Sequence, residues 1–162
     1  MKKFVLDFFD KKEIPTGTKI LTYVTSIRWI GWGFAENLIP IFIFSFVGSY
    51  AQAGLLKSAY EFALIISLPL IGILADRVKA TTLILAGLSL YLIVGTSYLF
   101  AGITGLAIFI VMARFSNGIA YAFDQVGRET YIRRNNISSK LATIFGYFDS
   151  VTNFWWIVAA LF

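Results

Sequence analysis

Five long apolar runs alternate with short polar segments along this chain of 162 residues. A helix needs roughly 20 mainly apolar residues to cross the hydrocarbon core of a bilayer, and each run is about that long. The pattern therefore predicts an all-α membrane protein, a helical bundle of about five transmembrane helices. The expected spans are residues 27–48, 53–75, 81–100, 103–123 and 141–162, so that an N-terminal segment, 1–26, precedes a transmembrane bundle, 27–162.

The polar segments between the spans differ in their content of Lys and Arg. Short loops that retain basic residues usually stay in the cytoplasm. One side of the predicted bundle has Lys57 as its only basic residue, whereas the other side has Lys2, Lys3, Lys11, Lys12, Lys19, Arg77, Lys79, Arg128, Arg133, Arg134 and Lys140. We therefore expect a multi-pass protein of a prokaryotic-type inner or plasma membrane. Its N-terminus, the hinge at 76–80 and the loop at 124–140 are expected to be cytoplasmic.

The composition agrees with a membrane location and excludes several classes of function. Hydrophobic residues make up 58% of the chain and charged residues 14%. The chain has no cysteine and no histidine, so thiolate metal sites and the usual proton shuttle are excluded, and we expect no metal, no cofactor and no enzymatic activity. The net charge of +5 is explained by basic cytoplasmic loops, so nucleic acid is not an expected partner.

Ionisable residues inside the spans are the candidates for function, because each costs a few kcal/mol at roughly the bilayer centre unless it faces a cavity or a partner. Glu36 lies near the middle of the first span, beside Asn37, and Arg114 lies near the middle of the fourth. An acid and a base at this depth suggest a pair that lines a cavity and binds a substrate or relays a proton. A buried structural ion pair is the alternative. Asp149, about two turns into the last span, is a further cavity candidate.

Two other charged residues in the second span have a simpler explanation. Lys57 and Glu61 are four residues apart, so they face the same side of a helix. A local contact between them near the membrane interface would account for both without any function.

Two short motifs resemble those of the major facilitator superfamily of secondary transporters. The signature of that family between its second and third helices is matched by Gly72, Leu74, Ala75, Asp76 and Arg77. An arginine motif of its fourth helix is matched by Arg114 and Gly118, with Asn117 and Ala122 in the surrounding positions. The resemblance covers residues 18–162 and implies the N-terminal half of that six-plus-six-helix fold. It also implies that the first and fourth helices line the central cavity.

The match to the hinge signature is incomplete. Lys79 stands where the family has a second glycine, and Ala80 and Thr81 replace its two closing basic residues. In the family a closing Arg reaches an acid at the cytoplasmic end of the fourth helix, here Asp124. The resemblance therefore implies that this pairing falls to Arg77 or Lys79, or is weakened. It implies a cytoplasmic gate formed by Gly72, Asp76, Arg77 and Asp124.

The function expected from these observations is secondary active transport of a small solute by alternating access. The expected partners are the solute, the lipid bilayer and a C-terminal half of the transporter, and proton coupling is left open. The last span becomes long enough to cross only at Phe162, so we expect the chain to be the N-terminal part of a longer protein. The alternative is a non-transporting membrane scaffold, a receptor-like protein or a truncated product of the same fold.

Overall fold

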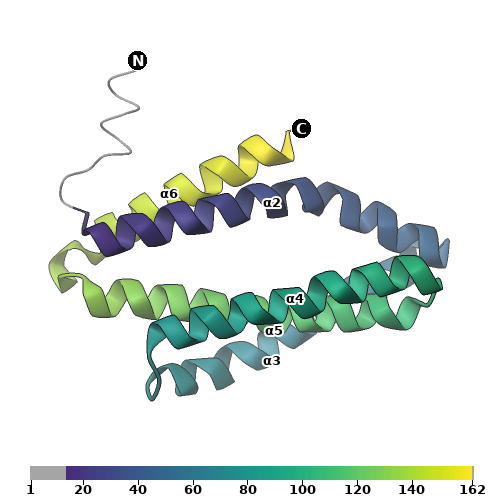
Figure 1. Cartoon of the computed structure of the whole chain (residues 1–162), viewed down its shortest axis with the longest axis horizontal. Helices are drawn as coiled ribbons and strands as arrows, with labels where there is room; N and C mark the ends of the chain where they lie inside the picture. The colour runs from purple at the N-terminus through teal and green to yellow at the C-terminus, as the bar shows by residue number, and fades with distance from the viewer. Residues whose placement is uncertain (1–13, 162) are drawn as a thin grey trace. The chain divides into compact units, whose positions relative to one another are not determined.

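A computed structural model describes residues 14–161, and the side chain of Glu36 is not described (Figure 1). This part of the chain is all-helical, as predicted, and contains no strand. Its elements are α2 (Thr16–Val47), α3 (Tyr50–Ala75), α4 (Ala80–Thr104), α5 (Ala107–Asn135), the short 3-10 helix η1 (Ser138–Lys140) and α6 (Leu141–Ala160).

Three of the helices in residues 14–161 are long and apolar enough to cross a membrane, namely α2, α3 and α4. Helix α5 has charged side chains along its second half, and α6 contains Asp149 and Asn153 within a largely apolar sequence. The five predicted helices are therefore confirmed as helices. Membrane crossing by α5 and α6 stays a prediction.

Helix α5 is longer than the predicted span at 103–123, and the prediction of a loop over 124–140 is wrong for most of that segment. The helix continues to Asn135, and only η1 and its short connection separate it from α6. The physical reason is that apolar residues past the predicted span are still packed into core clusters. Val126 packs in a core cluster, and Ile132 is fully buried in another. The charged residues indicated a loop, but they lie on a helix that extends past the apolar run.

The connection between α4 and α5 also differs from the predicted AG turn at 101–102. Ala101 lies inside α4 and is completely buried, and the helix ends at Gly105 instead. Gly105 has a φ of 70°, a left-handed conformation that glycine adopts without steric cost. Its N–H donates to the carbonyl of Ala101 at 2.9 Å, as expected for a glycine that closes a helix.

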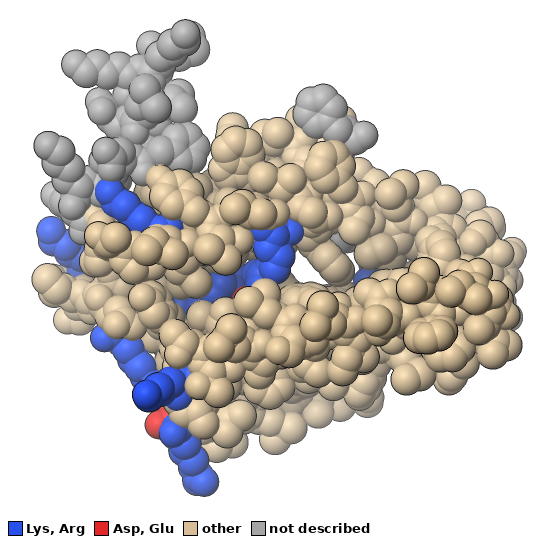
Figure 2. All heavy atoms as spheres, viewed as in Figure 1, with Lys and Arg blue, Asp and Glu red and all other residues tan. Residues whose placement is uncertain are grey.

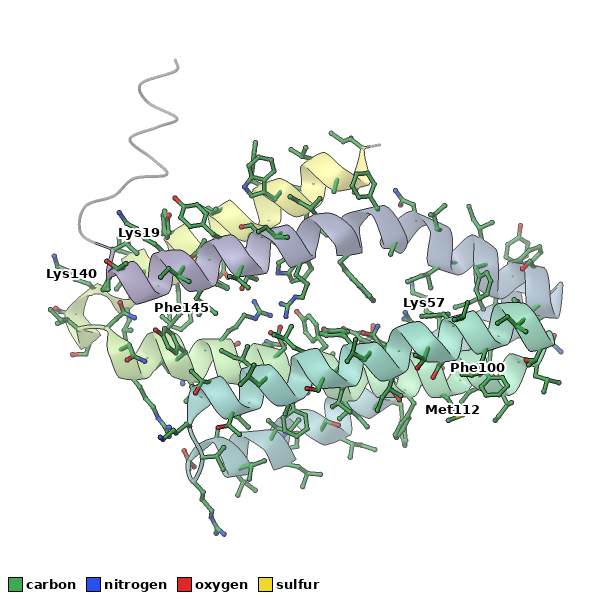
Figure 3. The ribbon with its side chains drawn as sticks, in the orientation of Figure 1. Lys19, Lys57, Phe100, Met112, Lys140 and Phe145 are labelled. Carbon is green, nitrogen blue, oxygen red and sulfur yellow. The ribbon has the colours of Figure 1, made fainter. Side chains whose placement is uncertain are left out.

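The described chain divides into two compact units. The first unit combines residues up to Asn37 with residues from Ile132 onwards. Its core contains Ile132, Ile144, Tyr147, Phe148 and Val151. Gly33 of α2 allows a close approach to α6, because a Cβ added there would lie 2.8 Å from both the Ala159 Cβ and the Trp156 carbonyl oxygen. Lys19 and Lys140 lie at the same end of this unit (Figure 3).

The second unit spans Leu38–Tyr131 and contains α3, α4 and most of α5. Helix α5 packs against α3 and against α4 through glycines. A Cβ added to Gly87 of α4 would lie 2.8 Å from the Ala120 carbonyl oxygen, and one added to Gly127 of α5 would lie 2.9 Å from the Ile84 nitrogen. Small residues at such contacts let helix backbones approach closely. The same unit contains two apolar clusters, one around Leu83 and Ala122 and the other around Ile43, Ala101 and Ile110.

Charge is unevenly distributed over the second unit. Helix α4 has no Lys, Arg, Asp or Glu, and its surface is uniformly tan in Figure 2. Charged atoms gather at the turn between α3 and α4, at the lower left of that view. The opposite end of α4 and α5 is apolar, and Phe100 and Met112 lie there (Figure 3). Phe100 stacks on Phe109, with ring centres 5.7 Å apart.

Candidate functional site

Arg114 is a buried cation in the first third of α5, and its side chain packs against α3. Only 6% of Arg114 is exposed. Its guanidinium carbon lies 4.9 Å from the centre of the Tyr60 ring, within the distance of a cation–π interaction. At 1.5 Å per residue, Arg114 is roughly 10 Å along the helix from Ala107, which places it well inside a hydrocarbon core if α5 spans a membrane.

Gly118, one turn after Arg114, sets the distance between α3 and α5. A Cβ added to Gly118 would clash with the carbonyl oxygen of Tyr60 and would lie 2.9 Å from both the Ala63 Cβ and the Leu64 nitrogen. Glycine is therefore required for this crossing of the two helices. The close approach brings the Tyr60 ring over the Arg114 side chain.

Asn117 lies between these two positions of α5 and is 1% exposed. Neither its Oδ1 nor its Nδ2 has a hydrogen-bond partner among the described residues, and the Nε of Arg114 also has none. A buried polar group without a partner costs about 1–3 kcal/mol. Arg114 and Asn117 lie one turn apart, and both have such unpaired polar atoms. We infer that their hydrogen-bond partners are groups other than the described side chains.

Tyr121 completes the polar face of α5. It lies two turns after Arg114, and its ring meets that of Tyr60 edge to face at 6.2 Å between centres. We refer to Tyr60, Arg114, Asn117 and Tyr121 as the Arg114 cluster. All four residues belong to the second unit.

The other predicted cavity residues belong to the first unit. Glu36 lies on α2, and because its side chain is outside the described atoms, the predicted pair with Arg114 stays a prediction. Asn37 is exposed, and its Nδ2 donates to the carbonyl of Ala160 at 3.0 Å, which ties α2 to α6. Asp149 is exposed on α6. The described contact therefore gives Asn37 a structural role within the first unit.

Among the predicted gate residues, Asp124 has a partner that the sequence analysis missed. Asp124 is 1% exposed, and it accepts a hydrogen bond from the Nε of Arg128 at 2.9 Å. Arg77 and Lys79 are exposed at the hinge, and no ion pair joins either of them to Asp124. The i, i+4 spacing of Asp124 and Arg128 was the signal that would have identified this pair. The pairing implied by the resemblance is thus replaced by one within α5.

The remaining hinge residues make few contacts. Asp76 is exposed, and Gly72 has open space where a Cβ would lie, so no close helix approach requires a glycine there. On the same helix, Lys57 and Glu61 are both exposed, and no ion pair links them. The predicted local contact between those two side chains is wrong.

Comparison of the chain with family models, with curated proteins and with solved structures finds no match. Residues 14–161 contain no group of three or more acidic residues that is arranged to hold a metal ion. The Arg114 cluster, in which the buried Arg114 contacts the Tyr60 ring and that ring meets Tyr121, is the candidate site that the described residues form. Of its members, Tyr60 and Tyr121 were missed by the sequence analysis.

Proposed function

We propose that this chain forms part of a secondary transporter that moves a small solute across a membrane by alternating access, as its resemblance to the major facilitator superfamily implies. The observation that carries the proposal is the burial of Arg114 and Asn117 with polar atoms that lack described partners. Ionisable residues within membrane helices are expensive, and those that persist commonly mark solute or ion pathways. A solute that completes the Arg114 cluster would offset this cost.

The distribution of basic residues supports a membrane orientation for the proposed transporter. Within the second unit, Arg77 and Lys79 lie at the α3–α4 turn, whereas the α4–α5 turn at Gly105 and Leu106 has no charge. Basic residues favour the cytoplasmic side. The α3–α4 turn and the N-terminus of the chain are therefore proposed to be cytoplasmic.

The proposed gate lies at the cytoplasmic end and combines two kinds of residue. The Asp124–Arg128 pair lies within the second half of α5, while the exposed Asp76 and Arg77 are available to a facing helix. Asp76 would accept hydrogen bonds from the N-terminal N–H groups of such a helix when the cytoplasmic side is closed. Breaking these contacts would allow the alternation of access.

Transport is tested with the protein expressed from its full reading frame and reconstituted into liposomes. Labelled anionic, neutral and cationic solutes that are too polar to cross a bare bilayer are added outside, and accumulation is compared with that in protein-free liposomes. Accumulation of one solute class is expected. A correctly folded protein that accumulates none of them would contradict transport and would favour the non-transporting scaffold.

A further inference from the structure

We infer that the Arg114 cluster binds the carboxylate of a small organic monoanion. The inference deepens the proposed function, since it names the chemical class of the transported solute, and it rests on that function for its role in transport. Binding itself is a property of the cluster and is measured separately.

The cluster has an excess of hydrogen-bond donors and a positive charge. A guanidinium carries five N–H donors and no acceptor, and it stays protonated in proteins. The amide of Asn117 adds two further N–H donors, and the tyrosine hydroxyls of the cluster can also donate. A carboxylate has only acceptors when it is ionised, and its two oxygens match the planar fork of a guanidinium. The chemistry of the cluster is therefore complementary to an oxyanion.

The acidic residues described in the second unit do not supply this oxyanion. Asp124 pairs with Arg128, and Glu129 accepts a hydrogen bond from the Nε2 of Gln125 at 3.1 Å. Glu61 and Asp76 are exposed, and no ion pair joins either of them to Arg114. Within this unit, Arg114 is thus a buried cation whose described neighbours are aromatic and amide groups.

Asn117 provides an independent indication of a ligand. It is 1% exposed, and both polar atoms of its amide lack a partner among the described residues. A carboxylate held by Arg114 would accept a hydrogen bond from the Asn117 Nδ2, which lies one turn further along the same face of α5. The Oδ1 of Asn117 would remain available to a donor group on the same solute.

The charge of the cluster favours a monoanion over a dianion. Arg114 is the one cation of the cluster, so a carboxylate leaves the complex neutral. A phosphate dianion would leave a net negative charge in a site of low dielectric constant, where an uncompensated charge is costly. Inorganic phosphate is therefore a useful comparison ligand.

The test measures thermal unfolding of the full-length protein in detergent with benzoate or benzamide as the probe. The two molecules have nearly the same shape, but only benzoate is an anion. We expect benzoate to raise the unfolding midpoint in a concentration-dependent way, and benzamide and phosphate to leave it unchanged. Equal shifts with benzoate and benzamide, or a shift with phosphate alone, would overturn the inference.

Three variants locate the binding position. Arg114→Gln and Asn117→Leu are each expected to weaken apparent benzoate affinity at least tenfold. Arg133→Gln, which removes an exposed arginine from the end of the same helix, is expected to leave the affinity unchanged. If Arg114→Gln does not fold, Asn117→Leu decides the question, because leucine has the same number and branching of side-chain heavy atoms as asparagine and suits an apolar bundle. Wild-type affinity in folded Asn117→Leu would contradict the inference.

A fourth variant separates a solute anion from an anion supplied by the protein. If the carboxylate of Glu36 occupies Arg114 permanently, benzoate will bind to Glu36→Gln and not to the wild type, and this result would overturn the inference. Failure of the inference is also distinguishable from failure of the proposed function. Accumulation of neutral solutes without benzoate binding would refute carboxylate binding by the Arg114 cluster but not transport. Benzoate binding without accumulation of any solute would refute transport but not carboxylate binding.

Discussion

The guanidinium of Arg114 lies over the aromatic ring of Tyr60, with 4.9 Å between the guanidinium carbon and the ring centre. This contact joins α5 to α3, and it places the buried Arg114 against the half-buried Tyr60. Cation–π contacts are worth about 2 kcal/mol when they are desolvated. The contact therefore stabilises a charge that would otherwise be costly within an apolar bundle.

Replacement of the Tyr60 ring should weaken both the fold and the site. Tyr60→Leu is expected to reduce the free energy of unfolding by about 2 kcal/mol, because Arg114 loses its aromatic neighbour. Tyr60→Phe retains the ring and should cost much less. Denaturation of the two variants in detergent micelles measures the difference. Equal stability of Tyr60→Leu and Tyr60→Phe would show that the contact of Arg114 with the aromatic ring does not stabilise the fold.

The crossing of α3 and α5 at Gly118 should tolerate no side chain. Gly118→Ala is expected to destabilise the protein by about 1–3 kcal/mol, since the new methyl group meets the α3 backbone. Gly95 of α4 is a matched control, because a Cβ added there meets nothing within 4 Å. Gly95→Ala should be neutral or stabilising by about 0.5–1 kcal/mol. Unfolding midpoints that rise in both variants would contradict the close approach at Gly118.

Loss of the buried ion pair in the second half of α5 should be severe. Asp124→Asn leaves the buried Arg128 without a compensating charge, which typically costs about 3–5 kcal/mol. Asp76→Asn, which changes an exposed carboxylate, should leave stability nearly unchanged and should reduce transport if Asp76 acts in the gate. Unfolding and transport measured on both variants separate the structural role from the gating role. If Asp124→Asn is as stable as the wild type, the Asp124–Arg128 ion pair does not stabilise the fold.

The absence of cysteine makes the membrane orientation directly measurable. Single cysteines are introduced at Lys79 and at Leu106, which lie in the turns at the two ends of α4. A membrane-impermeant thiol reagent added to intact cells should label Leu106→Cys, whereas Lys79→Cys should be labelled only after the membrane is opened. Labelling of both positions from the same side would show that α4 does not span.

The sequence predicted the helical class and the helices, because long apolar runs are a local signal. It also singled out Arg114, because a charge inside an apolar run stands out in the sequence, and the structure buries this residue. It did not predict Tyr60, since the register between α3 and α5 depends on the backbone contact at Gly118. The segment 124–135 was expected to be a loop because it is highly charged. Val126 and Ile132 each pack into a core cluster, so the helix continues to Asn135, and this continuation brings Arg128 to Asp124.

The most direct test of the account is counterflow of labelled polar carboxylates in liposomes that contain the full-length protein. Arg114→Gln is compared with Arg133→Gln, so that both variants lose one arginine from α5. We expect the wild type and Arg133→Gln to exchange a carboxylate, and Arg114→Gln to exchange it at least tenfold more slowly. Equal exchange by the two variants, or no carboxylate exchange by the folded wild type, would contradict it.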